Sequence, residues 1–257
     1  MVGLLGALAA CSGDDDDSSG KAGSAATTTT RSNATTSTTK ASSSSNGPTT
    51  TANGKGCTGT PPTVGQPANK GAVVDVDGDR KRDTAWLASP GNGKREMGVL
   101  TAAGGGDKVQ VDSASPVALT LLVADADNQA PVEFFLSDNR TVQLWAFADC
   151  KLQQVKDGRG APYLFDLGFR GNGTGVGCVD ADHDGDRDLV GLNVTKRTDT
   201  RVDWKRTIIE RVALRAANGH SDTGHYALPA DAAKVELLYT VSCGNLDIKR
   251  DGIRQPE

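Results

Sequence analysis

The sequence predicts an all-β domain, built from repeated units, behind a long polar N-terminal segment. Three observations support this prediction. Apolar and β-branched runs at strand-like spacing alternate with turn residues through positions 57–257. Short aspartate-rich stretches recur in front of several of these runs. Few segments show the apolar stripe of an amphipathic helix. Residues 57–257 are therefore the predicted globular head, and the residues before them need a separate explanation.

The first eleven residues, "MVGLLGALAAC", form an apolar run that ends in small residues and a cysteine. A membrane-spanning helix needs about 20 apolar residues, so this run is too short and is typical of the end of a signal peptide. Leu8, Ala9, Ala10 and Cys11 resemble the bacterial lipobox. That resemblance implies a signal peptide over residues 1–11, lipid on Cys11, and a protein anchored to the extracytoplasmic face of the cell membrane.

Residues 12–56 are dominated by Ser, Thr, Asp, Gly and Ala. Such a segment cannot bury enough apolar surface to offset the entropy of ordering. We therefore predict a disordered linker. A flexible chain of about 45 residues has an end-to-end distance of roughly 35–40 Å, which would hold the head away from the membrane surface.

Composition narrows the range of functions. The net charge is −4, from 28 Lys and Arg against 32 Asp and Glu, and the basic residues are scattered. This argues against nucleic acid as a partner. Only three histidines are present and aromatic residues make up 4% of the chain, which leaves little material for acid–base chemistry near neutral pH. We therefore expect a protein that is not an enzyme.

Four cysteines remain in the head, namely Cys57, Cys150, Cys178 and Cys243. An even number in an extracytoplasmic protein predicts two disulfides, for which three pairings exist. We favour Cys57–Cys243 with Cys150–Cys178, because closing the longest loop restricts the unfolded chain most in the entropic description of disulfides. A zinc site is the alternative, but the closely spaced cysteine pairs of zinc ribbons are missing.

The clearest motif is "DADHDGDRDLV", which begins at Asp180. We number the loop from Asp180 as position 1. The side chains at positions 1, 3 and 5 of a tight loop can converge on one point, and a glycine at position 6 permits the sharp turn. Position 7 then offers its backbone carbonyl and position 9 completes the shell of oxygens that Ca²⁺ requires. A divalent cation would also relieve the repulsion among the carboxylates. The predicted ligands at positions 1, 3, 5, 7 and 9 are Asp180, Asp182, Asp184, Asp186 and Asp188.

A similar stretch, "DVDGDRKRD", begins at Asp75, with Arg80 at the position of the glycine. Its predicted ligands at positions 1, 3, 5, 7 and 9 are Asp75, Asp77, Asp79, Lys81 through its backbone carbonyl, and Asp83. Neither stretch is an EF-hand, because position 12 is Trp86 in one and Gly191 in the other, where an EF-hand needs a glutamate.

A strand followed by such an aspartate loop and another strand resembles the FG-GAP or VCBS repeat, the calcium-loop blade of integrin-α-type β-propellers. The resemblance implies an all-β, propeller-like domain of repeated blades with bound Ca²⁺. A third copy is visible in "DADNQAPVE", where Asp125, Asp127, Gln129 and Glu133 stand at positions 1, 3, 5 and 9. Position 9 then recurs at spacings of 50 and 55 residues, and "KVELLYTVSC" suggests a fourth unit without a loop.

Four units of about fifty residues would fill the head. They could form a compact four-bladed ring, an open partial propeller, or a sandwich that is no propeller. The function we expect is binding of an extracellular protein or glycan through loops on a calcium-stabilised scaffold. Two alternatives are a cell-envelope hydrolase on the same scaffold and a purely structural envelope component.

Overall fold

The computed structural model describes residues 54–168 and 173–257, all within the compact unit Ser45–Glu257. The predicted signal peptide, the predicted lipidation site Cys11 and all but the last three residues of the predicted linker lie outside the described residues. The predicted head is almost entirely described.

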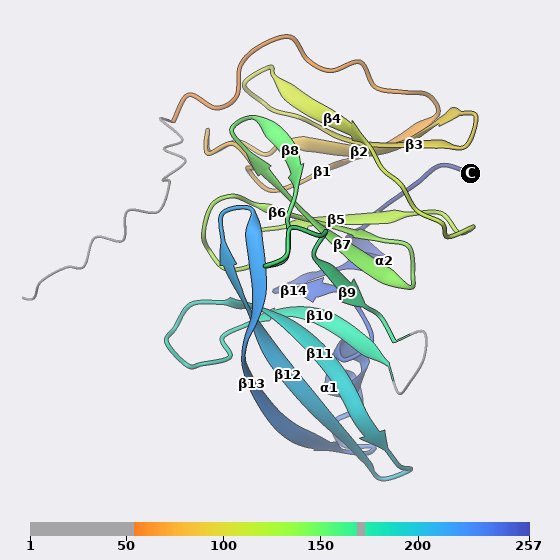
Figure 1. Ribbon diagram of the computed structural model, residues 1–257, viewed down its shortest axis with the longest axis vertical. Coiled ribbons are helices and arrows are strands. Elements are labelled where there is room, and N and C mark those ends of the chain that lie inside the picture. Colours follow the sequence, from red (N-terminus) through yellow and green to blue (C-terminus); the bar gives the residue numbers. More distant parts are fainter. Residues whose placement is uncertain (1–53, 169–172) are drawn as a thin grey trace, which may run out of the picture. The chain divides into compact units, whose positions relative to one another are not determined.

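The head begins with a four-stranded antiparallel sheet in which neighbouring strands follow one another in the chain (Figure 1). Its β2–β3 hairpin turns at Gly91, Asn92 and Gly93, which all have positive φ, a conformation that Gly and Asn adopt at low cost. The strands are β1 (Ala68–Ala72), β2 (Thr84–Gly91), β3 (Lys94–Leu100) and β4 (Gly106–Gln110).

The second sheet has the same order and direction and gains two further strands. Its four consecutive strands are β5 (Thr120–Ala124), β6 (Glu133–Ser137), β7 (Thr141–Ala148) and β8 (Lys151–Gln154). The short strand β9 (Leu164–Asp166) pairs with β7, and β16 (Ile253–Arg254) returns from the end of the chain to pair with β5.

The third sheet repeats the arrangement with longer strands. It consists of β10 (Thr174–Val179), β11 (Asp188–Arg197), β12 (Arg201–Val212) and β13 (Arg215–Ala227). Trp204 of β12 lies opposite Gly224 of β13, and a Cβ on that glycine would overlap the indole ring. The same pairing joins Trp86 of β2 to Gly98 of β3 in the first sheet.

Two apolar cores lie on the two faces of the second sheet. Successive side chains of a strand point to opposite faces, so on β6 Phe134 and Leu136 enter a core with Leu87 and Met97 of the first sheet. Phe135, between them, enters another core with Val176 and Leu189 of the third sheet. This explains why all five residues of β6 are buried, and it places the second sheet between the other two.

The chain after β13 does not form a fourth sheet of the same kind. The run 234–243, which we expected to be a strand, begins inside helix α1 (Ala232–Leu237) and ends in β14 (Ser242–Cys243), which pairs only with β15 (Leu246–Asp247). A further short helix, α2 (Ile248–Asp251), precedes β16. "AAKVEL" consists largely of good helix formers, and Val235 buries itself against the third sheet.

The prediction of an all-β head is therefore confirmed, while the expectation of four repeat units was wrong. Within residues 54–168 and 173–257 the structure has three consecutive four-stranded units, and none of the sheets closes on itself. The local apolar pattern of the last run did not distinguish a strand from a short helix, because both can bury one face.

The predicted disulfide pairing was also wrong. Cys57 bonds to Cys150 and Cys178 bonds to Cys243. Cys57 is bonded to the turn between β7 and β8, which contains Cys150. Val241, the residue before β14, forms a bridge with Val176 of β10 and so brings Cys243 next to Cys178. The preference for the longest loop considered only the entropy of the unfolded chain, whereas the pairing depends on which strands are neighbours in the folded one.

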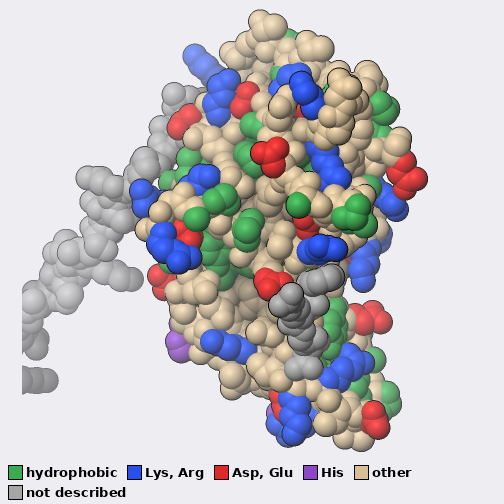
Figure 2. All heavy atoms as spheres, turned by 45° about the vertical axis from the view of Figure 1, so that its right-hand side comes forward, with side chains coloured by type: hydrophobic (Ala, Val, Ile, Leu, Met, Phe, Trp, Pro, Cys, Tyr) green, Lys and Arg blue, Asp and Glu red, His purple; other side chains and the backbone are tan. Residues whose placement is uncertain are grey.

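Among the described residues, no helix is long and apolar enough to cross a membrane. On the face drawn in Figure 2, Lys and Arg side chains are interspersed with Asp and Glu side chains over the whole head.

Candidate metal centres

Three aspartate-containing loops occupy the same position in the three sheets. Each one joins the first strand of its sheet to the second, after β1, β5 and β10. We call residues 75–83 the first loop, residues 125–133 the middle loop and residues 180–188 the third loop, and we number each from its first aspartate. The repeat recognised in the sequence is therefore also a repeat of the structure.

One hydrogen bond is common to all three loops. A carboxylate oxygen at position 9 accepts the backbone N–H of position 2, seven residues earlier. The distances are 2.7 Å for Asp83 and Val76, 3.0 Å for Glu133 and Ala126, and 2.8 Å for Asp188 and Ala181. This bond ties the start of each loop to the start of the following strand.

A second hydrogen bond recurs within the turn. The backbone N–H of position 5 donates to Oδ1 of the aspartate at position 3, over 3.2 Å in the first loop, 3.1 Å in the middle loop and 3.2 Å in the third. Asp and Asn side chains commonly bond the backbone two residues later in this way. The acceptors are Asp77, Asp127 and Asp182.

The backbone at position 4 is left-handed in every loop, with φ of 78° at Gly78, 56° at Asn128 and 67° at His183. At position 6 the third loop has Gly185 with φ of 99°, and the first loop has Arg80 with φ of 66°. The arginine thus adopts the same left-handed region that the glycine does, at the steric cost of a Cβ.

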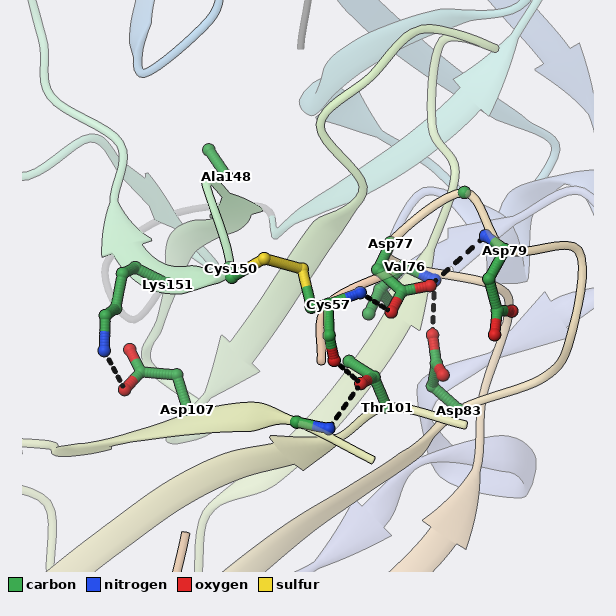
Figure 3. The surroundings of a disulfide bond; sticks show 12 residues. Cys57, Val76, Asp77, Asp79, Asp83, Thr101, Asp107, Ala148, Cys150 and Lys151 are labelled. Carbon is green, nitrogen blue, oxygen red and sulfur yellow. Dashed lines mark hydrogen bonds and ion pairs between the residues drawn. A yellow bond between two sulfur atoms is a disulfide. The ribbon is translucent and has the colours of Figure 1, made fainter. Parts of the chain in front are cut away.

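In the first loop Asp75, Asp77 and Asp83 each place a carboxylate oxygen within 4.8 Å of the others. Asp77 and Asp83 are buried, and Figure 3 shows them beside the Cys57–Cys150 disulfide. The N–H of Cys57 donates to Asp77 Oδ2 over 2.6 Å. Burial raises the pKa of Asp83, against the lowering effect of hydrogen bonds from Val76 and Ala102.

In the third loop Asp180, Asp182 and Asp188 form the corresponding group, again with oxygens within 4.8 Å of one another. Asp182 is exposed, and the other two are partly buried. Asp180 Oδ1 is buried and accepts no hydrogen bond from the described residues. A buried carboxylate oxygen without a donor costs free energy, and a cation would remove that cost.

The remaining predicted ligands lie outside these two groups. At position 5, Asp79 Oδ1 accepts the N–H of Lys81 and Asp184 Oδ1 accepts the N–H of Asp186, both over 2.8 Å. Lys81 and Asp186, expected to contribute backbone carbonyls at position 7, are exposed. The structure therefore brings together positions 1, 3 and 9, and it uses positions 5 and 7 to shape the turn.

The middle loop has a third acidic group, formed by Asp125, Asp127 and Glu133. Glu133 is completely buried, and this burial raises its pKa to about 8, although Arg211 acts to lower it. Burial likewise raises the pKa of Asp125. The sequence did not indicate the role of Arg211, because it lies 84 residues from Asp127 in an ordinary strand run.

No protein-family model, curated protein or solved structure matches the chain. The interpretation of the loops therefore depends on their own geometry.

Proposed function

We propose that the head is a calcium-stabilised, propeller-like binding module, held by a lipid on Cys11 at the extracytoplasmic face of a cell membrane. The observation that carries the proposal is the threefold recurrence of one loop, at one place in each sheet, with the same hydrogen bonds between positions 2 and 9 and between positions 3 and 5. In the first and third loops the carboxylates at positions 1, 3 and 9 also lie within 4.8 Å of one another, and a bound cation would offset their repulsion.

The chemistry of the first and third loops fits a hard cation. Their clustered donors are carboxylate oxygens only, the type of ligand that Ca²⁺ prefers. Within the described residues, no carboxylate of the Asp75, Asp77 and Asp83 group or of the Asp180, Asp182 and Asp188 group forms an ion pair with Lys or Arg. Ca²⁺ would supply the missing positive charge and fix each loop to its sheet.

The ions in this proposal are structural, and the protein needs no catalytic group. Binding would involve loops on a rigid scaffold, where recognition sites are common. A cavity of about 450 Å³ lies between the first and middle loops, within the size range of ligand sites. Val132 and Phe147 contribute apolar surface to it and Asp77 and Asp125 contribute carboxylates. We place the contact with an extracellular protein or glycan at this end of the sheets.

Calorimetric titration with Ca²⁺ tests the proposal. The sample is the full chain with Cys11→Ser, which prevents lipidation, after treatment with a chelator. Two ions should bind, with dissociation constants of about 10⁻⁴–10⁻³ M, as in extracellular calcium modules. At a hundredfold excess over its dissociation constant each ion should add about 2.7 kcal/mol to the free energy of unfolding.

Variants assign the ions to the loops. Asp182→Asn should remove one ion and Asp77→Asn the other, while the matched control Asp199→Asn, at an exposed aspartate outside the loops, should leave both. A heat signal indistinguishable from buffer, together with a melting temperature that does not respond to Ca²⁺, would contradict the proposal.

A further inference from the structure

The middle loop differs from its two counterparts in having a buried arginine against its carboxylates. Arg211 belongs to β12 of the third sheet, and its side chain is 2% exposed, while that of Glu133 is 0% exposed. The distance from Arg211 Nε to Glu133 Oε1 is 2.7 Å. The arginine thus reaches from one sheet into the loop of its neighbour.

The other nitrogens of the guanidinium also face oxygens. Arg211 Nη2 lies 2.9 Å from Asp127 Oδ1 and 3.0 Å from Asp127 Oδ2, and it donates to the backbone carbonyl of Gln129 over 3.1 Å. Nη1 donates to the carbonyl of Ala213 over 3.3 Å. Two carboxylates and a loop carbonyl are the oxygens expected around a metal ion in such a loop, and here they surround a guanidinium.

A second arginine, which lies in the third loop, also binds the middle loop. Arg187, at position 8 of that loop, donates through Nη2 to the carbonyl of Asp125 over 3.0 Å and to Asn128 Oδ1 over 2.9 Å. Two arginines, one from β12 and one from the third loop, therefore bind the middle loop. The carboxylate groups of the first and third loops have no comparable arginine among the described residues.

We propose that Arg211 is a built-in cation that takes the place of a metal ion in the middle loop, so that this loop binds no Ca²⁺ and instead joins the second and third sheets. Asp127 and Glu133 of the middle loop face a positive charge from within the chain, whereas Asp125 Oδ1 is buried and accepts no hydrogen bond from the described residues. A metal could reach Asp127 and Glu133 only by displacing a guanidinium whose donors are already engaged. The statement about Ca²⁺ rests on the proposed function, whereas the role of Arg211 as a counter-charge does not.

A double-mutant cycle tests the counter-charge without any metal. In EDTA, Arg211→Met should lower the melting temperature by about 10 °C, because it leaves the largely buried carboxylate of Asp127 without its partner. The matched control is Arg201→Met on the same strand, whose ion pair with Asp203 is exposed; it should lower the melting temperature by less than about 2 °C. Asp127→Asn combined with Arg211→Met should recover part of the loss.

Additive effects of Arg211→Met and Asp127→Asn would overturn the proposal, because they would show that Arg211 acts by packing alone. Should Arg211→Met fail to fold, Arg211→Lys replaces it in the cycle. The lysine retains the charge and loses the planar fork. It should be more stable than Arg211→Met by expression and melting, and a lysine variant no better than the methionine would count against the counter-charge.

Calorimetry with Ca²⁺ tests whether Arg211 prevents the middle loop from binding an ion. Relative to wild type, Arg211→Met should bind one additional ion, and adding Asp127→Asn should abolish that binding. A wild-type protein that binds three ions, one of them lost in Asp127→Asn, would overturn the inference while leaving the proposed function intact. Failure of the proposed function gives a different result from failure of this inference. The wild-type protein would then bind no ion, although the double-mutant cycle would still show coupling between Arg211 and Asp127.

Discussion

The middle loop and the third loop start from the same strand position and share the same two hydrogen bonds, yet their carboxylates have different surroundings. In both loops Oδ1 of the aspartate at position 1, Asp125 or Asp180, is buried without a donor among the described residues, but in the third loop Asp182 faces solvent. In the middle loop Glu133 and Asp127 contact a buried guanidinium from another sheet. One loop backbone therefore supports two environments for its carboxylates, one without an ion pair to Lys or Arg among the described residues and one with a guanidinium from another sheet.

Balancing the carboxylates with an external ion and balancing them with an internal arginine each has a disadvantage. A site for an external ion makes the stability of its loop depend on the metal concentration. An internal arginine needs no metal, but it must be desolvated together with its partners, and such a pair is stabilising only when its hydrogen bonds are nearly complete. Arg211 donates hydrogen bonds to Asp127, Gln129 and Ala213, while its contact with Glu133 Oε1 is an ion pair without a hydrogen bond.

The largest effect that separates the two loops should be the dependence of stability on pH. The pKa of Glu133 is raised to about 8 in the folded protein, from an ordinary value of 4.5. Between these values the folded state holds a proton that the unfolded state has lost, so stability is greatest below pH 4.5 for this group and falls as the pH rises toward 8. Asp125, Asp127 and Arg211 act on the same group.

Glu133→Gln should therefore reduce the loss of stability between pH 5 and pH 8, by up to about 4 kcal/mol. Urea unfolding of both proteins across this range measures the effect. Asp188→Asn, the equivalent change in the third loop, serves as the comparison and should leave the slope attributable to Glu133 unchanged. Parallel pH profiles for wild type and Glu133→Gln would show that the environment of Glu133 is not as the structure has it.

A smaller effect should come from a feature that all the loops share, the carboxylate at position 9. Asp83 accepts the N–H of Val76 and the N–H of Ala102, both over 2.7 Å. Asp83→Ala leaves both donors without this acceptor, and we expect a loss of about 3 kcal/mol in the free energy of unfolding.

Urea unfolding in EDTA measures this loss without a contribution from metal. The control Asp79→Ala in the same loop removes an acceptor for the exposed Lys81 N–H and an ion pair of 3.8 Å with the exposed Lys81 ammonium, and it should cost less than about 1 kcal/mol. Equal losses for the two variants would mean that position 9 does not anchor the loop.

The smallest effect concerns position 6 and makes the first loop more similar to the third. Arg80 has φ of 66° where the third loop has a glycine. Arg80→Gly removes the steric cost of a left-handed residue with a Cβ and should stabilise the protein by about 0.5–1 kcal/mol, after allowing for the greater freedom of glycine in the unfolded chain.

Lys81→Gly, at the next position and without a positive φ, should instead destabilise by about 0.5–1 kcal/mol. The melting temperatures of the two variants, measured by thermal unfolding, test this difference in sign. A destabilised Arg80→Gly protein would indicate that the arginine side chain makes a compensating contact.

Much of the architecture was predictable because its signals are local. Alternating apolar residues specify strands, as in "TVQLWAF" of β7, and the spacing of aspartates specifies the loops at 75–83 and 180–188. Even the weakly charged copy at Asp125 was recognisable, since position 9 kept its carboxylate as Glu133 and the strands on either side kept their apolar character.

Only the tertiary structure decided which distant residues meet. The cysteine pairing depends on which segments lie next to β10 and next to the turn between β7 and β8. Whether the apolar run at 234–243 forms a helix or a strand depends on the face that α1 buries. Arg211 could not be assigned from its sequence context, because its acidic partners Glu133 and Asp127 lie 78 and 84 residues away in the loop of another sheet. The sequence by itself determined the strands and the acidic loops through local spacing, whereas the pairing of charge with charge and sulfur with sulfur depended on how the sheets pack.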